Sequence, residues 1–229
     1  MAREIIPELK NVKAVYEQEG GIEGDFRLRK LKHLAGEKRT LTTHKENGCD
    51  FRVDVAKCYF SPRLATERLR IAEAVGDDER VLNMFAGVGP FSIQIAKKKR
   101  VRVTSCELSA YAADLHEQND RINKVEKLVE VVNADATEWG RSTRSRFDRI
   151  LMPHPSQSDR FLSTALSLAK KGCRVHYYRH LLGRDEAEGK ERLRAELSAL
   201  LPRRAKSVMR KVREVGPRWI EMVADISLP

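Results

Sequence analysis

The period of the apolar positions changes near residue 80. Upstream, residues 38–55 form two runs of alternating β-like character on either side of Asn47-Gly48, the dipeptide that best supplies two left-handed residues for a tight hairpin turn. Downstream, strand-like runs alternate with segments of helical period. We therefore predict a small β-rich N-terminal region, residues 1–60, followed by an α/β domain, residues 61–229.

The downstream segment predicts a parallel sheet with helices on both faces. Strands are expected at residues 80–85, 100–106, 128–133, 147–152 and 174–180, with helices at 90–98, 110–122, 158–171 and 185–201. Such alternation is typical of parallel strands joined by right-handed crossovers. The last two β-prone runs, 206–215 and 218–226, have no helix between them, so we expect them to pair antiparallel at one edge.

Composition excludes a disordered chain and favours a polyanionic partner. Of the 229 residues, 41% are hydrophobic and 34% are charged, which is enough apolar surface to build a core. Lysine and arginine number 44 against 33 acidic residues, giving a formal charge of +11. This charge favours nucleic acid through phosphate neutralisation, although a generally basic surface would produce the same balance.

The sequence predicts neither a membrane segment nor a metal site. No run approaches the roughly 18 apolar residues that span a bilayer, and the N-terminus lacks the apolar stretch of a signal peptide, so we expect a cytoplasmic protein. His176 and His180 share one strand face but have no third ligand nearby. We interpret the cysteines, which form no C-x-x-C, as reduced thiols: Cys49, Cys58, Cys106 and Cys173.

Candidate chemistry begins at Gly87-Val88-Gly89, where the first predicted strand of the sheet turns into a helix. In a doubly wound sheet, ligands bind at the carboxyl ends of the strands, and glycines in this turn let the backbone approach them closely. A dinucleotide fingerprint would need a third glycine where Ser92 stands. A nicotinamide or flavin cofactor is therefore disfavoured.

Two acidic residues follow the next two predicted strands. Glu107 could accept hydrogen bonds from both hydroxyls of a ribose, and Asp135, with the backbone N–H that follows it, could bind an adenine. Each has a structural alternative, since Glu107 lies near Ser109, the expected helix cap, and Asp135 suits a turn. The spacing fits an adenosine ligand without a pyrophosphate.

Three segments together resemble the archaeal and eukaryotic tRNA guanine-N1 methyltransferases: FAGVGPF (85–91), HKENGCDFRVDVAKCYFSPRLATERLR (44–70) and RVHYY (174–178). Those enzymes use S-adenosylmethionine to methylate guanosine 37, on the 3′ side of the anticodon. The resemblance implies a class I methyltransferase fold with a Rossmann-like sheet. Members of the family usually carry an additional N-terminal domain that helps to recognise the tRNA body, and we expect this chain to lack it.

The resemblance also implies site residues. It places S-adenosylmethionine over the glycine turn and assigns its contacts to Tyr59, Phe85, Gly87, Val88, Gly89, Glu107, Leu108, Asp135 and Ala136. It assigns the general base that removes the guanine N1 proton to Glu67, and the cation that stabilises charge on O6 to Arg27. Judged without the family, Glu67 fits a helical ion-pair array with Arg63 and Arg70. A base here needs burial that outweighs these arginines.

The chain departs from the family pattern at two places. Asn83 stands where the family usually has an acid. In LMPHPSQ, Pro153 replaces the asparagine thought to orient the target base, whereas Pro155 matches the family's proline. Proline has no N–H and no polar side chain, so a backbone carbonyl or His154 takes over, or the substrate differs. Considered alone, His154 is an ordinary loop histidine.

We therefore expect an enzyme that methylates N1 of guanosine 37, acts as a monomer, and contacts tRNA at the anticodon stem-loop through Arg63, Arg68 and the basic C-terminal region. One alternative is the related aminocarboxypropyl transferase of wybutosine biosynthesis, against which Pro90 and the Ser61-Pro62-Arg63 segment argue. A second alternative is a catalytically silent RNA-binding homologue, motivated by Asn83 and Pro153.

Overall fold

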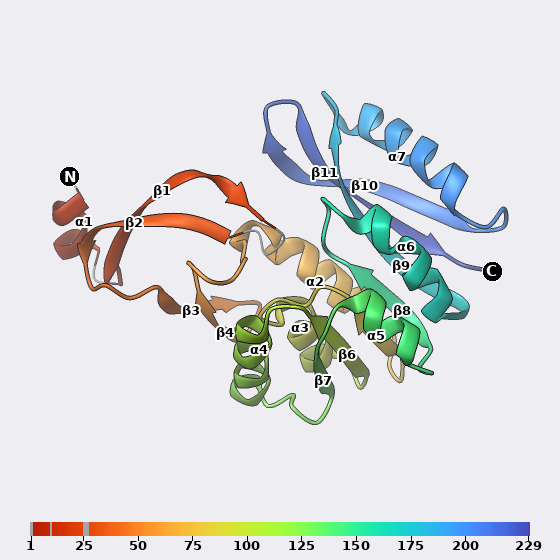
Figure 1. The fold of residues 1–229 in the computed structure, drawn as a ribbon, viewed down its shortest axis with the longest axis horizontal. Helices are drawn as coiled ribbons and strands as arrows, with labels where there is room; N and C mark the ends of the chain where they lie inside the picture. The colour runs from red at the N-terminus through yellow and green to blue at the C-terminus, as the bar shows by residue number, and fades with distance from the viewer. Residues whose placement is uncertain (1, 10, 25–27) are drawn as a thin grey trace.

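The computed structural model describes residues 2–9, 11–24 and 28–229. Its central sheet has the strand order β10-β11-β9-β8-β5-β6-β7 (Figure 1). Five neighbouring strands of this sheet, from β9 to β7 in the order given, are parallel: β5 (Arg80–Asn83), β6 (Arg102–Glu107), β7 (Val129–Asn133), β8 (Phe147–Met152) and β9 (Ala169–Leu182). The hairpin β10 (Lys206–Gly216) and β11 (Trp219–Ser227) adds to β9 in antiparallel orientation, as predicted.

Helices cover both faces of this sheet (Figure 1). One face carries α2 (Ala65–Ala74), α3 (Pro90–Lys98) and α4 (Ala110–Asn123), and the other carries α5 (Ala136–Ser142), α6 (Ser158–Leu168) and α7 (Glu186–Leu200). Successive strand residues serve opposite cores, because Val81 packs in the first cluster and Leu82 in the second. The predicted α/β fold class is confirmed.

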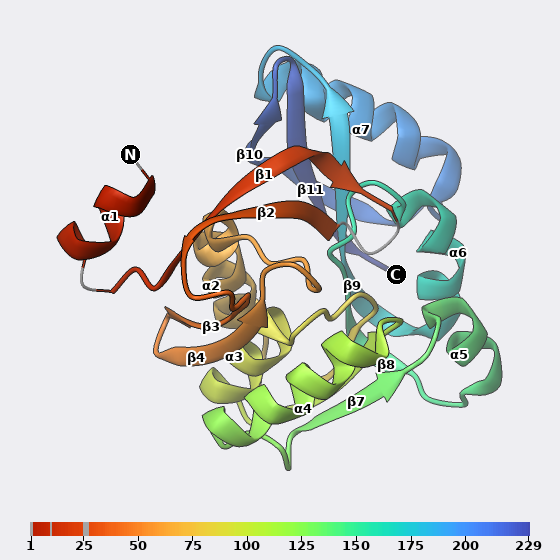
Figure 2. The ribbon, with the colours of Figure 1, turned by 60° about the vertical axis from the view of Figure 1, so that its left-hand side comes forward.

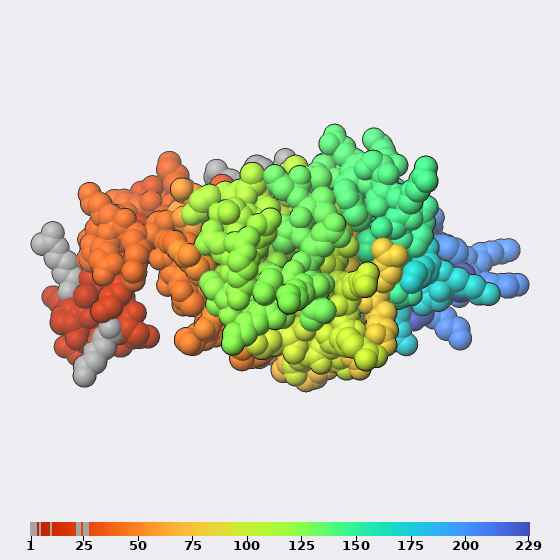
Figure 3. All heavy atoms as spheres, turned by 90° about the horizontal axis from the view of Figure 1, so that it is seen from below, coloured from red at the N-terminus to blue at the C-terminus, as the bar shows by residue number. Residues whose placement is uncertain are grey.

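The N-terminal region is β-rich, as predicted. After α1 (Ala2–Glu8), the strands β1 (Ala14–Glu23) and β2 (Leu28–Gly36) form an antiparallel hairpin. Figure 3 shows this region projecting at one end of the molecule. In Figures 1 and 2, the end of β1 and the start of β2 reach back to the body of the molecule, while α1 lies at the far end.

A second hairpin, β3 (Leu41–Glu46) and β4 (Cys49–Asp54), turns at Asn47 and Gly48, whose φ angles are 49° and 74°. The predicted tight turn is therefore confirmed. This hairpin packs on α4, where Asn119 accepts a 2.7 Å hydrogen bond from the Arg52 amide, and it buries Phe51 in the first core cluster. Residues 41–54 thus share a core with the larger domain, and the division at residue 60 stays a prediction.

The structure differs from the sequence prediction at some element boundaries and contains elements that were not predicted. The helix expected over residues 158–171 ends at Leu168, and Gly172, with φ 75°, lies inside β9 near a register shift. The pattern did not indicate α1, α5 or the β1–β2 hairpin. Ser61 precedes the short helix η1 (Pro62–Leu64), which leads into α2. None of the helices in the described ranges is both long enough and apolar enough to span a membrane.

Candidate active site

Two adjoining cavities open at the carboxyl ends of β5, β6 and β8. The larger has a volume of about 300 Å³ and the smaller of about 60 Å³. Four residues line both cavities and form the wall between them: Tyr59, Phe85, Gly87 and Pro153. Ligands of open α/β sheets bind at this edge, so the larger cavity is the candidate active site.

The two glycines of the turn have different roles. Gly87, with φ 55°, lines both cavities, and a Cβ there would meet only the Tyr59 carbonyl, at 3.9 Å. Gly89, with φ 90°, lies against α4, where a Cβ would be 2.3 Å from the ring of His116. Val88 is fully buried in the core. Gly87 therefore faces the candidate ligand, whereas Gly89 allows close packing of the turn on α4; the cofactor roles predicted for Val88 and Gly89 stay predictions.

Glu107, at the end of β6, is fixed by backbone amides beside the larger cavity. The Gly87 amide donates to Oε2 at 2.7 Å and the Ser109 amide donates to Oε1 at 2.8 Å. Burial raises the pKa of Glu107, against the opposing effect of these amides. Each oxygen keeps acceptor capacity for a ligand. Leu108, which is 52% exposed, lines the same cavity.

Asp135 caps α5 and also lines the larger cavity. Its Oδ1 accepts hydrogen bonds from the amides of Thr137 at 2.8 Å and Glu138 at 3.1 Å. The structural alternative for Asp135, a local turn or cap, is thus observed. Ala136 follows it in the lining. The adenine contact assigned to this pair stays a prediction that its position permits.

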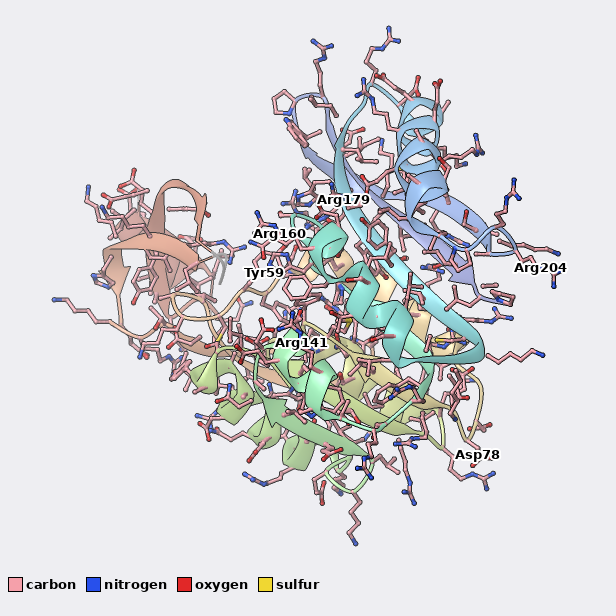
Figure 4. The ribbon with its side chains drawn as sticks, turned by 45° about the vertical axis from the view of Figure 1, so that its right-hand side comes forward. Tyr59, Asp78, Arg141, Arg160, Arg179 and Arg204 are labelled. Carbon is pink, nitrogen blue, oxygen red and sulfur yellow. The ribbon has the colours of Figure 1, made fainter. Side chains whose placement is uncertain are left out.

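The opposite wall comes from the start of α6, which sequence reasoning did not single out. Phe85 packs against His154 and Phe161, with ring centroids 5.2 Å and 4.8 Å apart. Arg160 also lines the larger cavity, and Figure 4 shows it beside Tyr59. The available signal was the position of this helix directly after the fourth predicted strand, where a ligand-facing loop is expected.

Of the two prolines in the altered loop, one reaches the cavities. Pro153 lines both, whereas Pro155 is buried and its carbonyl accepts a 2.9 Å hydrogen bond from the His180 amide. His154 lines only the larger cavity. Pro155 therefore fixes the loop to β9, and Pro153 presents an apolar ring where the two cavities meet.

Glu67 is held tightly on α2. Its Oε1 accepts hydrogen bonds from the Tyr178 hydroxyl at 2.6 Å and from Arg70 at 2.7 Å, and Arg70 also binds Oε2 at 2.7 Å. The same arginine forms hydrogen bonds of 2.8 and 3.2 Å with Asp225 on β11. Glu67 is 8% exposed, so it is a buried ion-pair member. Tyr178, its partner, lines the smaller cavity.

The predicted cations have different surroundings. Arg63 is exposed, but Arg68 is only 2% exposed and forms two 2.6 Å hydrogen bonds with Glu46. An RNA phosphate would reach Arg68 only if this buried pair opened, and both RNA contacts stay predictions. Arg27 lies outside the described residues. Arg29, on β2, places its guanidinium 5.8 Å from the ring centroid of Tyr59.

The ion pair of Arg213 and Glu221 supports the wall between the cavities and was not predicted from the sequence. Arg213 on β10 donates to Glu221 on β11 at 2.6 Å, to the Ser61 hydroxyl at 2.9 Å and to the Tyr59 hydroxyl at 3.1 Å. Alternation along the two strands of the C-terminal hairpin could have indicated that both side chains face inward, but not which loop they contact.

The parallel sheet extended by an antiparallel C-terminal hairpin, with a ligand cavity beside the glycine turn, places the chain in the class of Rossmann-like methyltransferases. Its sequence matches the family described as the TRM5/TYW2 methyltransferase domain over residues 42–200. The chain therefore belongs to that family, as the sequence resemblance predicted.

Individual relatives agree with this assignment. The tRNA (guanine(37)-N(1))-methyltransferase Trm5b of Pyrococcus abyssi is 44% identical over 178 residues, 78% of this chain and 52% of the relative. The tRNA 4-demethylwyosine(37)-methyltransferase Taw21 of Saccharolobus solfataricus is 34% identical over 227 residues, 99% of this chain and 84% of the relative. The solved complex of aTrm5 and tRNALeu is similar with a TM-score of 0.84 at 33% identity, covering 99% of this chain and 64% of the solved one. The chain thus spans about half the length of the Trm5b relative.

Proposed function

We propose that this protein transfers a methyl group from S-adenosylmethionine to N1 of guanosine 37 in tRNA. The observation that carries the proposal is the half-buried Glu107 carboxylate, held by the Gly87 amide beside a cavity of about 300 Å³, in a chain of the TRM5/TYW2 family. Membership supports the reaction class, and the cavity supports a nucleoside-containing cofactor.

The residues present fit S-adenosylmethionine. Glu107 would accept the ribose hydroxyls, Asp135 and the Ala136 amide would bind the adenine, and Leu108 would cover it. Tyr59 and Phe85 would enclose the ligand at the wall shared by the cavities. When bound, the cofactor supplies an electrophilic methyl group, so the protein must align the nucleophile and remove its proton.

Glu67 is the proposed acceptor of the guanine N1 proton. The base must lose this proton for N1 to attack, and a carboxylate within hydrogen-bond reach can take it. Arg70 and Tyr178 orient Glu67, and Asp225 shares Arg70 and so offsets part of its charge. Arg27 is proposed to stabilise the negative charge that develops on O6.

The proposed RNA partner is tRNA. The protein is proposed to bind it as a monomer, in the cytoplasm. A formal charge of +11 supports binding to a phosphate backbone. The exposed Arg63 lies close in sequence to the proposed base. More basic residues lie after α7, in the loop that follows it and on β10: Arg203, Arg204, Lys206, Arg210 and Lys211. Figure 4 shows Arg204 at a distance from Tyr59, so Arg204 would contact a different part of the tRNA.

A second candidate is methylation of 4-demethylwyosine at the same position, favoured by the Taw21 relative and by Pro153. Proline offers no amide to read a guanine edge. The test is transfer from labelled S-adenosylmethionine to unmodified tRNA with guanosine 37, to tRNA with adenosine 37, and to tRNA carrying 4-demethylwyosine, each with nucleoside analysis.

One-methylguanosine formed only on the guanosine substrate supports the main proposal, and a product only on the third substrate supports the second candidate. Transfer of the aminocarboxypropyl group instead of methyl would support the wybutosine-pathway alternative. Binding of tRNA without saturable binding of S-adenosylmethionine would support the silent homologue.

A further inference from the structure

Two large apolar side chains lie exposed next to each other at the carboxyl end of β9. Trp219, the first residue of β11, pairs with Leu182, the last residue of β9, and the two residues are 43% and 46% exposed. None of the aromatic or cation–π contacts among the described residues involves the indole ring of Trp219. Adjacent exposed apolar side chains of this size indicate an interaction surface when charged residues surround them.

This pair lies on the same face of the sheet as the smaller cavity and the proposed base. Residues two apart on a strand point to the same face. Trp219 therefore shares a face with Glu221, which lines the smaller cavity. On β9, Leu182 shares a face with Tyr178, which donates to the proposed base Glu67. Because two strand residues span about 7 Å, Trp219 lies just outside the wall of that cavity.

Arginines flank the pair. Arg218, which directly precedes Trp219, is exposed and forms none of the ion pairs found within the described ranges. Arg184, in the turn after β9, is also exposed and pairs with Glu188 at 3.2 Å. The Gly183 amide donates to the Arg218 carbonyl at 2.9 Å, which joins the two turns. An open aromatic face beside an unpaired cation suits a nucleotide, with the base on the ring and the phosphate at the arginine.

We propose that Trp219 stacks on the base of a nucleotide adjacent to the target guanosine in the anticodon loop of tRNA, and that Arg218 contacts a phosphate beside it. This inference rests on the proposed function, since it takes the target base to lie at Glu67. A base reaches a catalytic group only after it has left the stack of the loop, and its neighbour then loses a stacking partner. Trp219 replaces that partner outside the cavity. Every base has a π face, so this contact adds affinity without reading the sequence.

Fluorescence reports the contact directly, because the chain has only two tryptophans. In Trp139→Phe, Trp219 is the only one left, and saturating anticodon stem-loop RNA should quench its emission. An abasic site on one side of guanosine 37 should abolish the quenching, whereas an abasic site in the stem should not. Anisotropy of a label on the RNA shows that each RNA is bound. Bound RNA that leaves the emission unchanged, or quenching that survives an abasic site on either side, would overturn the inference.

Affinity for full-length tRNA is the second measurement. Trp219→Leu keeps an apolar side chain but removes the stacking ring, and should weaken tRNA binding by about fivefold or more. Trp219→Phe keeps a ring and should retain most of the affinity. Arg218→Gln should lower the slope of log affinity against log salt by about one, whereas Trp219→Leu should leave that slope unchanged. Ile122→Ala, a 44% exposed apolar residue at the end of α4, is the control and should change nothing.

The other outcomes separate this inference from the proposed function. Equal weakening by Trp219→Leu and Trp219→Phe, or no weakening by Trp219→Leu, would overturn the stacking role. If Trp219→Leu converted a dimer into a monomer in sedimentation while tRNA affinity stayed the same, the surface would join two copies of the chain and the inference would fall. Wild-type protein that binds tRNA through Trp219 but transfers no methyl group would contradict the proposed function alone. If the wild type bound no tRNA, both would fall.

Discussion

The hydroxyl of Tyr178 on β9 donates a 2.6 Å hydrogen bond to Oε1 of Glu67 on α2. Burial and the adjacent carboxylate raise the pKa of Tyr178 well above its usual value, so the hydroxyl stays protonated and acts as the donor. Because Tyr178 also lines the smaller cavity, it connects the proposed base with the wall of that cavity.

Tyr178→Phe should therefore slow methyl transfer while leaving cofactor binding intact. Without its second donor, Glu67 is oriented by Arg70 alone, and such misplacement of a catalytic group can lower kcat by about tenfold or more. Tyr177→Phe is the matched control, since that neighbouring hydroxyl binds Glu196 on the opposite face. Single-turnover rates should fall only for Tyr178→Phe. If Tyr178→Phe were as fast as Tyr177→Phe, Tyr178 would have no role in positioning the base.

Gly87→Ala should weaken S-adenosylhomocysteine binding about tenfold or more. The added methyl group enters the space between the cavities, and a left-handed alanine also costs about 1–2 kcal/mol of stability. Gly172→Ala has the same backbone penalty, at φ 75°, but its Cβ meets nothing within 4 Å. Calorimetry and thermal unfolding on both variants separate the two effects. Unchanged affinity in Gly87→Ala would contradict the assignment of this cavity to the cofactor.

The buried pair of Asp120 and His116, behind the glycine turn, makes the stability of the folded protein depend on pH. Burial raises the pKa of Asp120 to about 7 and lowers that of His116 to about 3, and their side chains lie 3.5 Å apart on α4. Since the unfolded aspartate titrates near pH 4, the native state holds a proton that the unfolded state has lost between about pH 4 and 7. Stability from Asp120 therefore falls as the pH rises through this window.

Asp120→Asn removes this penalty. Its free energy of unfolding should exceed that of the wild type by about 2–4 kcal/mol at pH 8 and by much less at pH 4.5. Urea unfolding at the two pH values measures the difference. Asp114→Asn, an exposed change on the same helix, should show no such trend. A gain of the same size at both pH values would contradict the buried, protonated state of Asp120.

Much of the fold could be predicted because its signals are local. The turn at Asn47-Gly48, the strand-to-helix turn at Gly87 and the edge hairpin depend on short patterns that tertiary packing did not override. The acids after β6 and β7 were found for the same reason, since the carboxyl ends of parallel strands meet at one edge.

The missed features depend on pairings across long distances in sequence. Tyr178 and Glu67 are 111 residues apart, and Arg213 and Tyr59 are 154 apart. Arg149, inside β8, is 1% exposed because Glu79 and His176 provide its hydrogen bonds. No periodicity distinguishes such an arginine from an exposed one, so buried ion pairs became visible only in the structure.

The most direct test of the account is single-turnover methyl transfer to tRNA with guanosine 37 by the wild type and by Glu67→Gln, with nucleoside analysis and S-adenosylhomocysteine binding measured in parallel. We expect one-methylguanosine from the wild type. In the variant we expect a transfer rate at least about a hundredfold lower, with a cofactor affinity equal to that of the wild type. Absence of one-methylguanosine from the wild type would contradict the proposed reaction, and a full rate in Glu67→Gln would contradict the role of Glu67.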